Sequence, residues 1–182
     1  FASVIGLVFT MRPLKEGFSP LGWVLLILSA LLTILAVGFE IWRYYRAKPK
    51  EFIEQPKIND YMHNWISKGS RVVICTRDMS WVDGKAMIEM LHSKAKNNEL
   101  CICLPKHTQL TRELERSGAE VYDYGDLDYV LQSRFTIINK DKFDAQVAVG
   151  RRMGNKHVIE EYSVGTQPVF AVANDLIEMI KK

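Results

Sequence analysis

The pattern of hydrophobic and polar positions divides the chain into two parts. Residues 21–39 form an apolar run that contains no charged side chain. In a helix that rises about 1.5 Å per residue, such a run covers the roughly 30 Å hydrocarbon core of a bilayer. Trp23 lies at one end and Trp42, Tyr44 and Tyr45 lie at the other, as in the aromatic belts of the two membrane interfaces. We expect a transmembrane helix here. A buried core helix is the alternative, but a small domain could not surround it.

A second apolar stretch, residues 1–11, is too short to span a bilayer alone. The polar link over residues 12–20 contains proline and glycine, which favour a tight turn. We therefore expect residues 1–46 to form a transmembrane helical hairpin whose first helix is truncated at Phe1. A cleaved signal peptide is the alternative interpretation.

Basic residues flank the predicted span unequally. The cluster after it is Arg43, Arg46, Lys48 and Lys50, and the link before it holds Arg12 and Lys15. The positive-inside rule therefore predicts an inner-membrane protein whose C-terminal part is cytoplasmic. Cysteines at positions 75, 101 and 103 lie inside apolar runs, which is typical of buried, reduced thiols and agrees with that compartment.

Residues 47–57 contain two prolines and mixed charge, and we interpret them as a linker. Beyond the linker, residues 58–182 alternate between strand-like and helical patterns. The expected strands are residues 71–76, 100–104, 119–124, 134–139, 145–150 and 157–163. The expected helices are residues 59–68, 84–96, 108–117 and 169–182. This order predicts an α/β fold with a mixed sheet, in which parallel βαβ units lead into antiparallel strands.

Charge and motifs narrow the chemistry. A net charge of +3 is too mild to indicate a nucleic-acid-binding stripe. The sequence has no glycine-rich phosphate loop, no paired CxxC and no helix with two histidines four apart, so we predict no cofactor. Cys101 and Cys103 share one face of a strand near His107 in sequence, but a fourth zinc ligand is not apparent.

Residues 132–139 read Gln-Ser-Arg-Phe-Thr-Ile-Ile-Asn and resemble the H-x-K-x-x-x-x-D strand of the phospholipase D family. The preceding order is similar as well: a strand followed by Thr-Arg-Asp-Met-Ser-Trp at residues 76–81, then a helix and a strand. The resemblance covers about residues 55–182 and implies a phospholipase D-like mixed-sheet domain.

Departures from the family motif decide what the resemblance implies. The family's histidine, lysine and aspartate fall on Gln132, Arg134 and Asn139. Glutamine cannot form the covalent phospho-intermediate that the family's histidine forms. Arg151 and Arg152 stand where the family has a small hydroxyl residue. The resemblance thus implies a domain that is not an enzyme and that keeps a polar pocket.

A pocket of this kind can still bind an anion. Arg134 offers a planar, permanently charged fork suited to phosphate, and Thr76 follows the first strand, where open α/β sheets usually hold ligands. The candidate ligand-binding residues are Thr76, Arg77, Ser80, Trp81, Gln132, Arg134, Asn139, Arg151 and Arg152. The alternative is that the arginines are ordinary surface residues and that Trp81 is part of the core.

We expect a membrane effector that responds to a nucleotide or cyclic nucleotide. In outline it resembles the small two-span effectors of bacterial antiphage defence systems, which implies a homo-oligomer that disrupts the bilayer. Small residues in the predicted span would allow close helix packing. One alternative is a membrane-tethered phosphodiesterase or nuclease that uses a non-standard nucleophile such as His157. Another is a membrane scaffold without a ligand.

Overall fold

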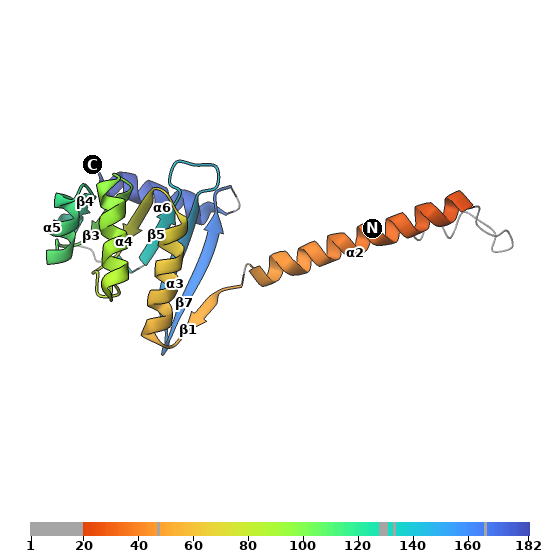
Figure 1. The fold of residues 1–182 in the computed structure, drawn as a ribbon, viewed down its shortest axis with the longest axis horizontal. Coiled ribbons are helices and arrows are strands. Elements are labelled where there is room, and N and C mark those ends of the chain that lie inside the picture. The colour runs from red at the N-terminus through yellow and green to blue at the C-terminus, as the bar shows by residue number, and fades with distance from the viewer. Residues whose placement is uncertain (1–19, 47, 128–130, 133, 166) are drawn as a thin grey trace. The chain divides into compact units, whose positions relative to one another are not determined.

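The computed structural model describes residues 20–46, 48–127, 131–132, 134–165 and 167–182. The chain divides after Ala47 into two units, and the second, Lys48–Lys182, contains the sheet and its packed helices. Figure 1 shows the elements of both units.

Helix α2 (Pro20–Arg46) contains the apolar run and is the one helix of the described residues that is long and apolar enough to cross a membrane. Its 27 residues correspond to about 40 Å of helix. A membrane anchor and a signal sequence both have this length and composition. The first helix of the expected hairpin falls within residues 1–19, which lie outside the described residues.

The second unit is built on one mixed sheet, which confirms the expected α/β class. Its described strands are β1 (Lys50–Phe52), β2 (Val72–Cys75), β3 (Leu100–Leu104), β4 (Glu120–Asp123), β5 (Arg134–Ile138), β6 (Gln146–Met153) and β7 (Lys156–Ser163). They lie in the order β1-β7-β6-β5-β2-β3-β4. Strands β2, β3 and β4 are parallel, and the other neighbours are antiparallel.

Helices cover both faces of this sheet (Figure 1). The helices are α3 (Gln55–Lys68), α4 (Lys85–Lys96), α5 (Gln109–Arg116) and α6 (Pro168–Ile180), and a 3-10 turn η1 (Gly125–Leu127) follows β4. Apolar side chains of α3, α4 and α5 pack with one face, and those of α6 pack with the other. The central strands β2 and β3 are buried on both faces, which explains why their sequences are continuously apolar.

The structure differs from the expected organisation before β2. Strand β1 and the first turn of α3 occupy most of residues 47–57, which the proline content indicated as a linker. Pro56 lies in the first turn of α3, where a missing N–H costs nothing because that N–H has no partner within the helix. Only residues 47–49 therefore separate α2 from the sheet.

Candidate ligand-binding site

A cavity of about 270 Å³ lies at the end of the sheet where β2 ends and where β5 and β7 begin. Strand β2 is parallel to β3, and the carboxyl ends of parallel strands are the usual ligand position in open α/β sheets. Side chains of α3 and of the segment between β2 and α4 complete the walls.

The lining of this pocket is largely apolar with a few polar groups. Apolar side chains come mainly from Ile58, Met62, Ile74, Trp81 and Ile159. Polar side chains come from Gln55, Thr76, Ser80, Thr136, Arg134 and His157. Among the described lining residues, the guanidinium of Arg134 is the only fixed charge.

Arg134 faces a carboxylate that does not lie in the pocket lining. Its Nη2 is 3.9 Å from Oδ2 of Asp78, a distance too long for a hydrogen bond. Asp78 accepts hydrogen bonds at Oδ1 from the Ser80 N–H at 3.1 Å and from the Ser80 hydroxyl at 2.5 Å. The hydrogen bond from Ser80 lowers the pKa of Asp78, and the charges of Arg134 and Arg77 lower it further. Asp78 is therefore ionised at neutral pH, and it forms a weak ion pair that a better-placed anion can replace.

His157 stands beside Arg134 at the start of β7. Burial lowers the pKa of His157, and the positive charges of Arg134 and Arg152 lower it further, so the imidazole is neutral at neutral pH. Gly150 on β6 makes room for this ring, because a Cβ at Gly150 would lie 2.9 Å from Nε2 of His157. The pocket thus holds one cation and one neutral imidazole.

Four of the residues expected at the site come together in this pocket. Thr76, Ser80, Trp81 and Arg134 all line it. The hydroxyl of Thr76 donates to the carbonyl oxygen of Asp78 at 2.5 Å, and the Tyr124 hydroxyl donates to the Thr76 carbonyl oxygen at 3.1 Å. These bonds hold the segment that carries Ser80 and Trp81 against the end of β2.

Four other expected residues lie near this end of the sheet but outside the lining. Arg77 and Gln132 are exposed. Arg151 is exposed on β6 and donates to Oε1 of Glu160 at 2.8 Å. The Nε of Arg152 donates to the Gly154 carbonyl oxygen at 3.2 Å, within the β6–β7 turn.

Asn139 lies at the opposite end of β5 from Arg134. Five residues along a strand span about 17 Å, so a motif of this spacing cannot place both side chains in one pocket. Oδ1 of Asn139 accepts from the Ser70 N–H at 2.9 Å, and its Nδ2 donates to Asp144 at 2.8 Å. These bonds give Asn139 a structural role in the loop after β5.

The sequence alone did not indicate the positions of Asp78, Gln55 and Met62, and it offered His157 only as an alternative nucleophile. His157 reaches the pocket through the registers of β5 with β6 and of β6 with β7, which join residues far apart in sequence. Asp78 was visible only as a polar residue after a buried strand.

The candidate metal ligands do not assemble. Cys101 and Cys103 are buried on the α6 face of the sheet, whereas the His107 ring faces Glu115 and Asp123 at 3.9 and 3.6 Å. Within the part of the chain that the structure describes, no three His, Cys, Asp or Glu side chains form a metal-binding group. Burial and the neighbouring Cys101 raise the pKa of Cys75 to about 12, so this thiol is protonated.

Comparisons with known proteins identify a similar fold and no matching family. No protein-family model matches the chain, and no curated protein matches it. Among solved structures, the fold is similar to polyphosphate kinase from Porphyromonas gingivalis, with a TM-score of 0.44 and 9% identity. The match covers 66% of this chain and only 22% of the kinase chain. A likeness of this degree says nothing about function, and the relationship to the phospholipase D family stays a prediction.

Proposed function

We propose that Lys48–Lys182 binds a small phosphate-containing ligand of the nucleotide type, cyclic nucleotides included, in the pocket beside Arg134. The observation that supports this most directly is the charge of the pocket: one guanidinium in an otherwise neutral and largely apolar cavity. A guanidinium presents a rigid fork of N–H donors that matches phosphate oxygens. The hydroxyl of Ser80 and the amide of Gln55 supply neutral hydrogen bonds without opposing an anion.

The size of the pocket limits the ligand. Its volume of about 270 Å³ lies near the lower end of small-molecule sites, which are roughly 300 to 1,000 Å³. A ligand of mononucleotide size therefore suits the pocket better than a long oligonucleotide. The apolar wall of Ile58, Met62 and Trp81 would contact the base or another apolar part of the ligand.

A thermal-shift screen of the purified full chain tests ligand binding. A ligand that binds the folded protein at 100 times its Kd stabilises it by about 2.7 kcal/mol, which raises the melting temperature. We expect a nucleotide to do this for the wild type and for Arg151→Glu, whose side chain lies outside the pocket, but not for Arg134→Glu. A screen in which no phosphate compound shifts the wild type would contradict the proposal and favour a scaffold without a ligand.

We further propose that α2 anchors this domain in the cell inner membrane, that the domain is cytoplasmic, and that the ligand controls bilayer permeability in antiphage defence. Two features support this role in membrane permeability: the resemblance to two-span defence effectors and the apolar length of α2. Assembly into a homo-oligomer belongs to the same proposal, since one helix cannot form a pore. The ligand must bind the open and closed assemblies unequally, because a ligand with equal affinity for both shifts nothing.

Dye release from vesicles that carry the full chain tests this output. Addition of the ligand found in the screen is expected to change the rate of release in the wild type and in Arg151→Glu. Vesicles that carry Arg134→Glu are expected to release dye at the same rate with and without the ligand. A wild type that binds ligand without any change in release would leave the binding proposal standing and refute the control of permeability.

A second candidate, phosphodiester hydrolysis, has one observation in its favour. The neutral imidazole of His157 lies in the same pocket as Arg134 and is chemically able to attack phosphorus. Against it, the pKa of the nearby Asp78 is lowered, so this carboxyl group is ionised and cannot give a proton to the leaving group. Incubation with nucleic acid, cyclic nucleotides and phospholipids tests this candidate. Turnover that His157→Ala abolishes and His63→Ala retains would establish it in place of simple binding.

A further inference from the structure

Arg152 lies just beyond the lining of the pocket, on the same face of the sheet as Arg134. Strand register places Arg134 opposite Gly150, and Arg152 is two residues further along β6. Residues two apart along a strand point to the same face, and diagonal neighbours on adjacent strands have Cα atoms about 7 to 8 Å apart. The two arginines therefore flank the same part of the sheet.

His157 completes this group of side chains. It is the partner of Arg152 in the register of β6 with β7. Its ring leans over Gly150, since a Cβ at that position would lie 2.9 Å from Nε2 of His157. The charges of Arg134 and Arg152 both lower the pKa of His157, which agrees with two cations close to the ring. The three side chains thus surround one point of the surface, where glycine leaves no side chain of its own.

The charge of Arg152 is not balanced by a carboxylate of the described residues. Its Nε donates to the carbonyl oxygen of Gly154 at 3.2 Å, and its two terminal nitrogens have no partner in that part of the chain. Arg151 provides the contrast, because it lies on the opposite face of β6 and pairs with Glu160 at 2.8 Å. One strand therefore carries one arginine that is paired and one that is free to bind an anion.

The charges at the mouth of the pocket favour a ligand with more than one negative charge. Arg134 and Arg152 are both positive, His157 is neutral, and Asp78 offsets one positive charge from 3.9 Å. Like charges on neighbouring strands repel each other, and an anion between them removes that cost. Each guanidinium can bind the oxygens of one phosphate through paired N–H donors.

The position of Arg152 also fits the dimensions of the pocket. The cavity of about 270 Å³ suits a ligand of mononucleotide size, and Arg152 lies outside its lining. A second phosphate at Arg152 extends from the first toward solvent, so it needs no further room inside the cavity.

We propose that Arg152 forms a second phosphate subsite, and that the ligand is a nucleotide with two adjoining phosphates, such as a nucleoside diphosphate. Arg134 holds the phosphate next to the sugar, and Arg152 holds the outer phosphate at the mouth of the pocket. The neutral imidazole of His157 donates one hydrogen bond to a phosphate oxygen between them. This inference rests on the proposed binding of a nucleotide beside Arg134 and names its class more closely.

Calorimetric titration of the full chain with the 5′-monophosphates and 5′-diphosphates of adenosine, guanosine, cytidine and uridine tests the proposal. The readout is the ratio of diphosphate affinity to monophosphate affinity for the same nucleoside. We expect the wild type to bind the diphosphate about fivefold more tightly, which is the gain from one exposed ion pair. Arg152→Gln is expected to lower this ratio to about one. Unchanged monophosphate binding shows that this variant is folded.

Arg151→Gln is the matched control, because it removes the same charge from the same strand on the opposite face. It is expected to keep the wild-type ratio, whereas a general dependence on positive charge would lower it. Arg134→Gln is expected to weaken the binding of both nucleotides.

A ratio near one in the wild type would overturn the second subsite, and so would a ratio that Arg152→Gln leaves unchanged. Either result would leave nucleotide binding beside Arg134 intact. An equal fall of the ratio in Arg151→Gln and Arg152→Gln would also overturn it, because the effect would then come from overall charge. Binding of no nucleotide by the wild type would refute the proposed function itself, and this inference with it.

Discussion

Asp78 competes with an incoming anion for Arg134. The carboxylate is ionised, lies 3.9 Å from the guanidinium and is held by Ser80, so it lowers the attraction of the pocket for phosphate. We expect Asp78→Asn to tighten ligand binding by about 1 kcal/mol, roughly fivefold, since the carboxylate is about half exposed and screened. Calorimetry measures this. Asp83→Asn, in the same segment but outside the pocket, is expected to leave affinity unchanged.

His157 should make ligand binding depend on pH. Its pKa is lowered from the ordinary value of 6.5, so the free pocket holds a neutral imidazole at neutral pH. A bound anion favours the charged imidazolium, so binding takes up a proton. The affinity therefore rises as pH falls through the pKa of His157 in the complex, and it levels off below the lowered pKa of the free protein. The increase is at most about tenfold per pH unit for one proton. Titrations with a phosphodiester, whose own charge is constant over this range, measure the effect. Retention of the full pH dependence in His157→Gln would refute this assignment.

The sequence predicted the residues of the site that follow strand β2, but it missed those that reach the site through the fold. Thr76, Ser80 and Trp81 follow a short, fully apolar run, and the end of such a parallel strand is a usual ligand position. Arg134 was found through the family motif. Asp78 and His157 reach Arg134 through a turn conformation and through strand register, neither of which has a local signal in sequence. Asn139 was placed with Arg134 by the motif, although strand geometry separates them.

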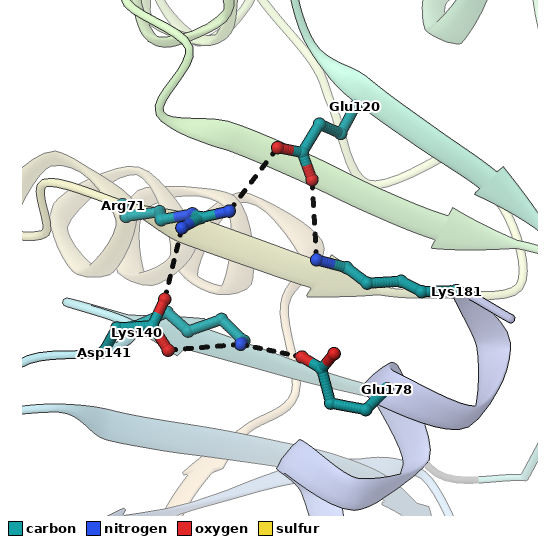
Figure 2. Close-up of polar contacts among 6 residues, drawn as sticks. All are labelled: Arg71, Glu120, Lys140, Asp141, Glu178 and Lys181. Carbon is teal, nitrogen blue, oxygen red and sulfur yellow. Dashed lines mark hydrogen bonds and ion pairs between the residues drawn. The ribbon is translucent and has the colours of Figure 1, made fainter.

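At the scale of elements, α6 is attached to the sheet by ion pairs as well as by apolar packing. Nζ of Lys140 donates a hydrogen bond to Glu178 of α6. Nζ of Lys181, directly after α6, lies 3.5 Å from Glu120, which also pairs with Arg71 (Figure 2). Lys140 is buried, whereas its acidic partners are about half exposed. The network therefore positions α6 and the loop after β5 together.

Lys140→Met should loosen α6. The substitution keeps the buried stem and removes the charge that pairs with Glu178, at an expected cost of about 1 kcal/mol in the free energy of unfolding. Urea unfolding measures the total loss of stability, and hydrogen exchange of the α6 amides shows whether this loss occurs in α6. Lys142→Met changes an exposed neighbour and is expected to stay within about 0.5 kcal/mol of the wild type. Equal protection of α6 in both variants would contradict the role of the network.

Acid should weaken the same attachment. The hydrogen bond from Lys140 lowers the pKa of Glu178 below its ordinary value of 4.5. A carboxyl group with a lowered pKa stabilises the folded state above its ordinary pKa, and this contribution is lost as pH falls through the lowered value. The wild type should thus lose more stability below pH 4.5 than Lys140→Met does. Parallel slopes of unfolding free energy against pH would contradict this.

The boundaries of β3, α4 and α5 followed the sequence pattern closely. The expected strand at residues 100–104 and β3 coincide, the expected helix at 84–96 begins one residue before α4, and the expected helix at 108–117 extends one residue beyond α5 at each end. The pattern failed at β1, because three exposed or half-exposed residues at a sheet edge carry no apolar periodicity. Pairing with β7 alone makes them a strand.

At the scale of the whole molecule, α2 decides whether the domain works at a membrane. Arginine at the centre of a membrane helix costs about 2.5 to 3.5 kcal/mol for insertion. We therefore expect Leu31→Arg to reduce the fraction of chain that resists carbonate extraction, while Tyr45→Arg, at the end of the helix, leaves it unchanged. Mass spectrometry of the membrane-bound chain separates the anchor from a cleaved signal sequence. Loss of residues through α2 would refute anchoring.

Calorimetric titration of the full chain with the nucleotide found in the screen tests the central claim, that Arg134 holds a phosphate in this pocket. Removal of a charged hydrogen-bond donor costs about 1.5 to 3 kcal/mol, so Arg134→Gln should weaken binding by roughly 10- to 150-fold. Arg151 is equally cationic, but it is exposed on β6 and pairs with Glu160. Arg151→Gln should therefore bind the nucleotide as the wild type does. Equal affinity of Arg134→Gln and the wild type would contradict the account.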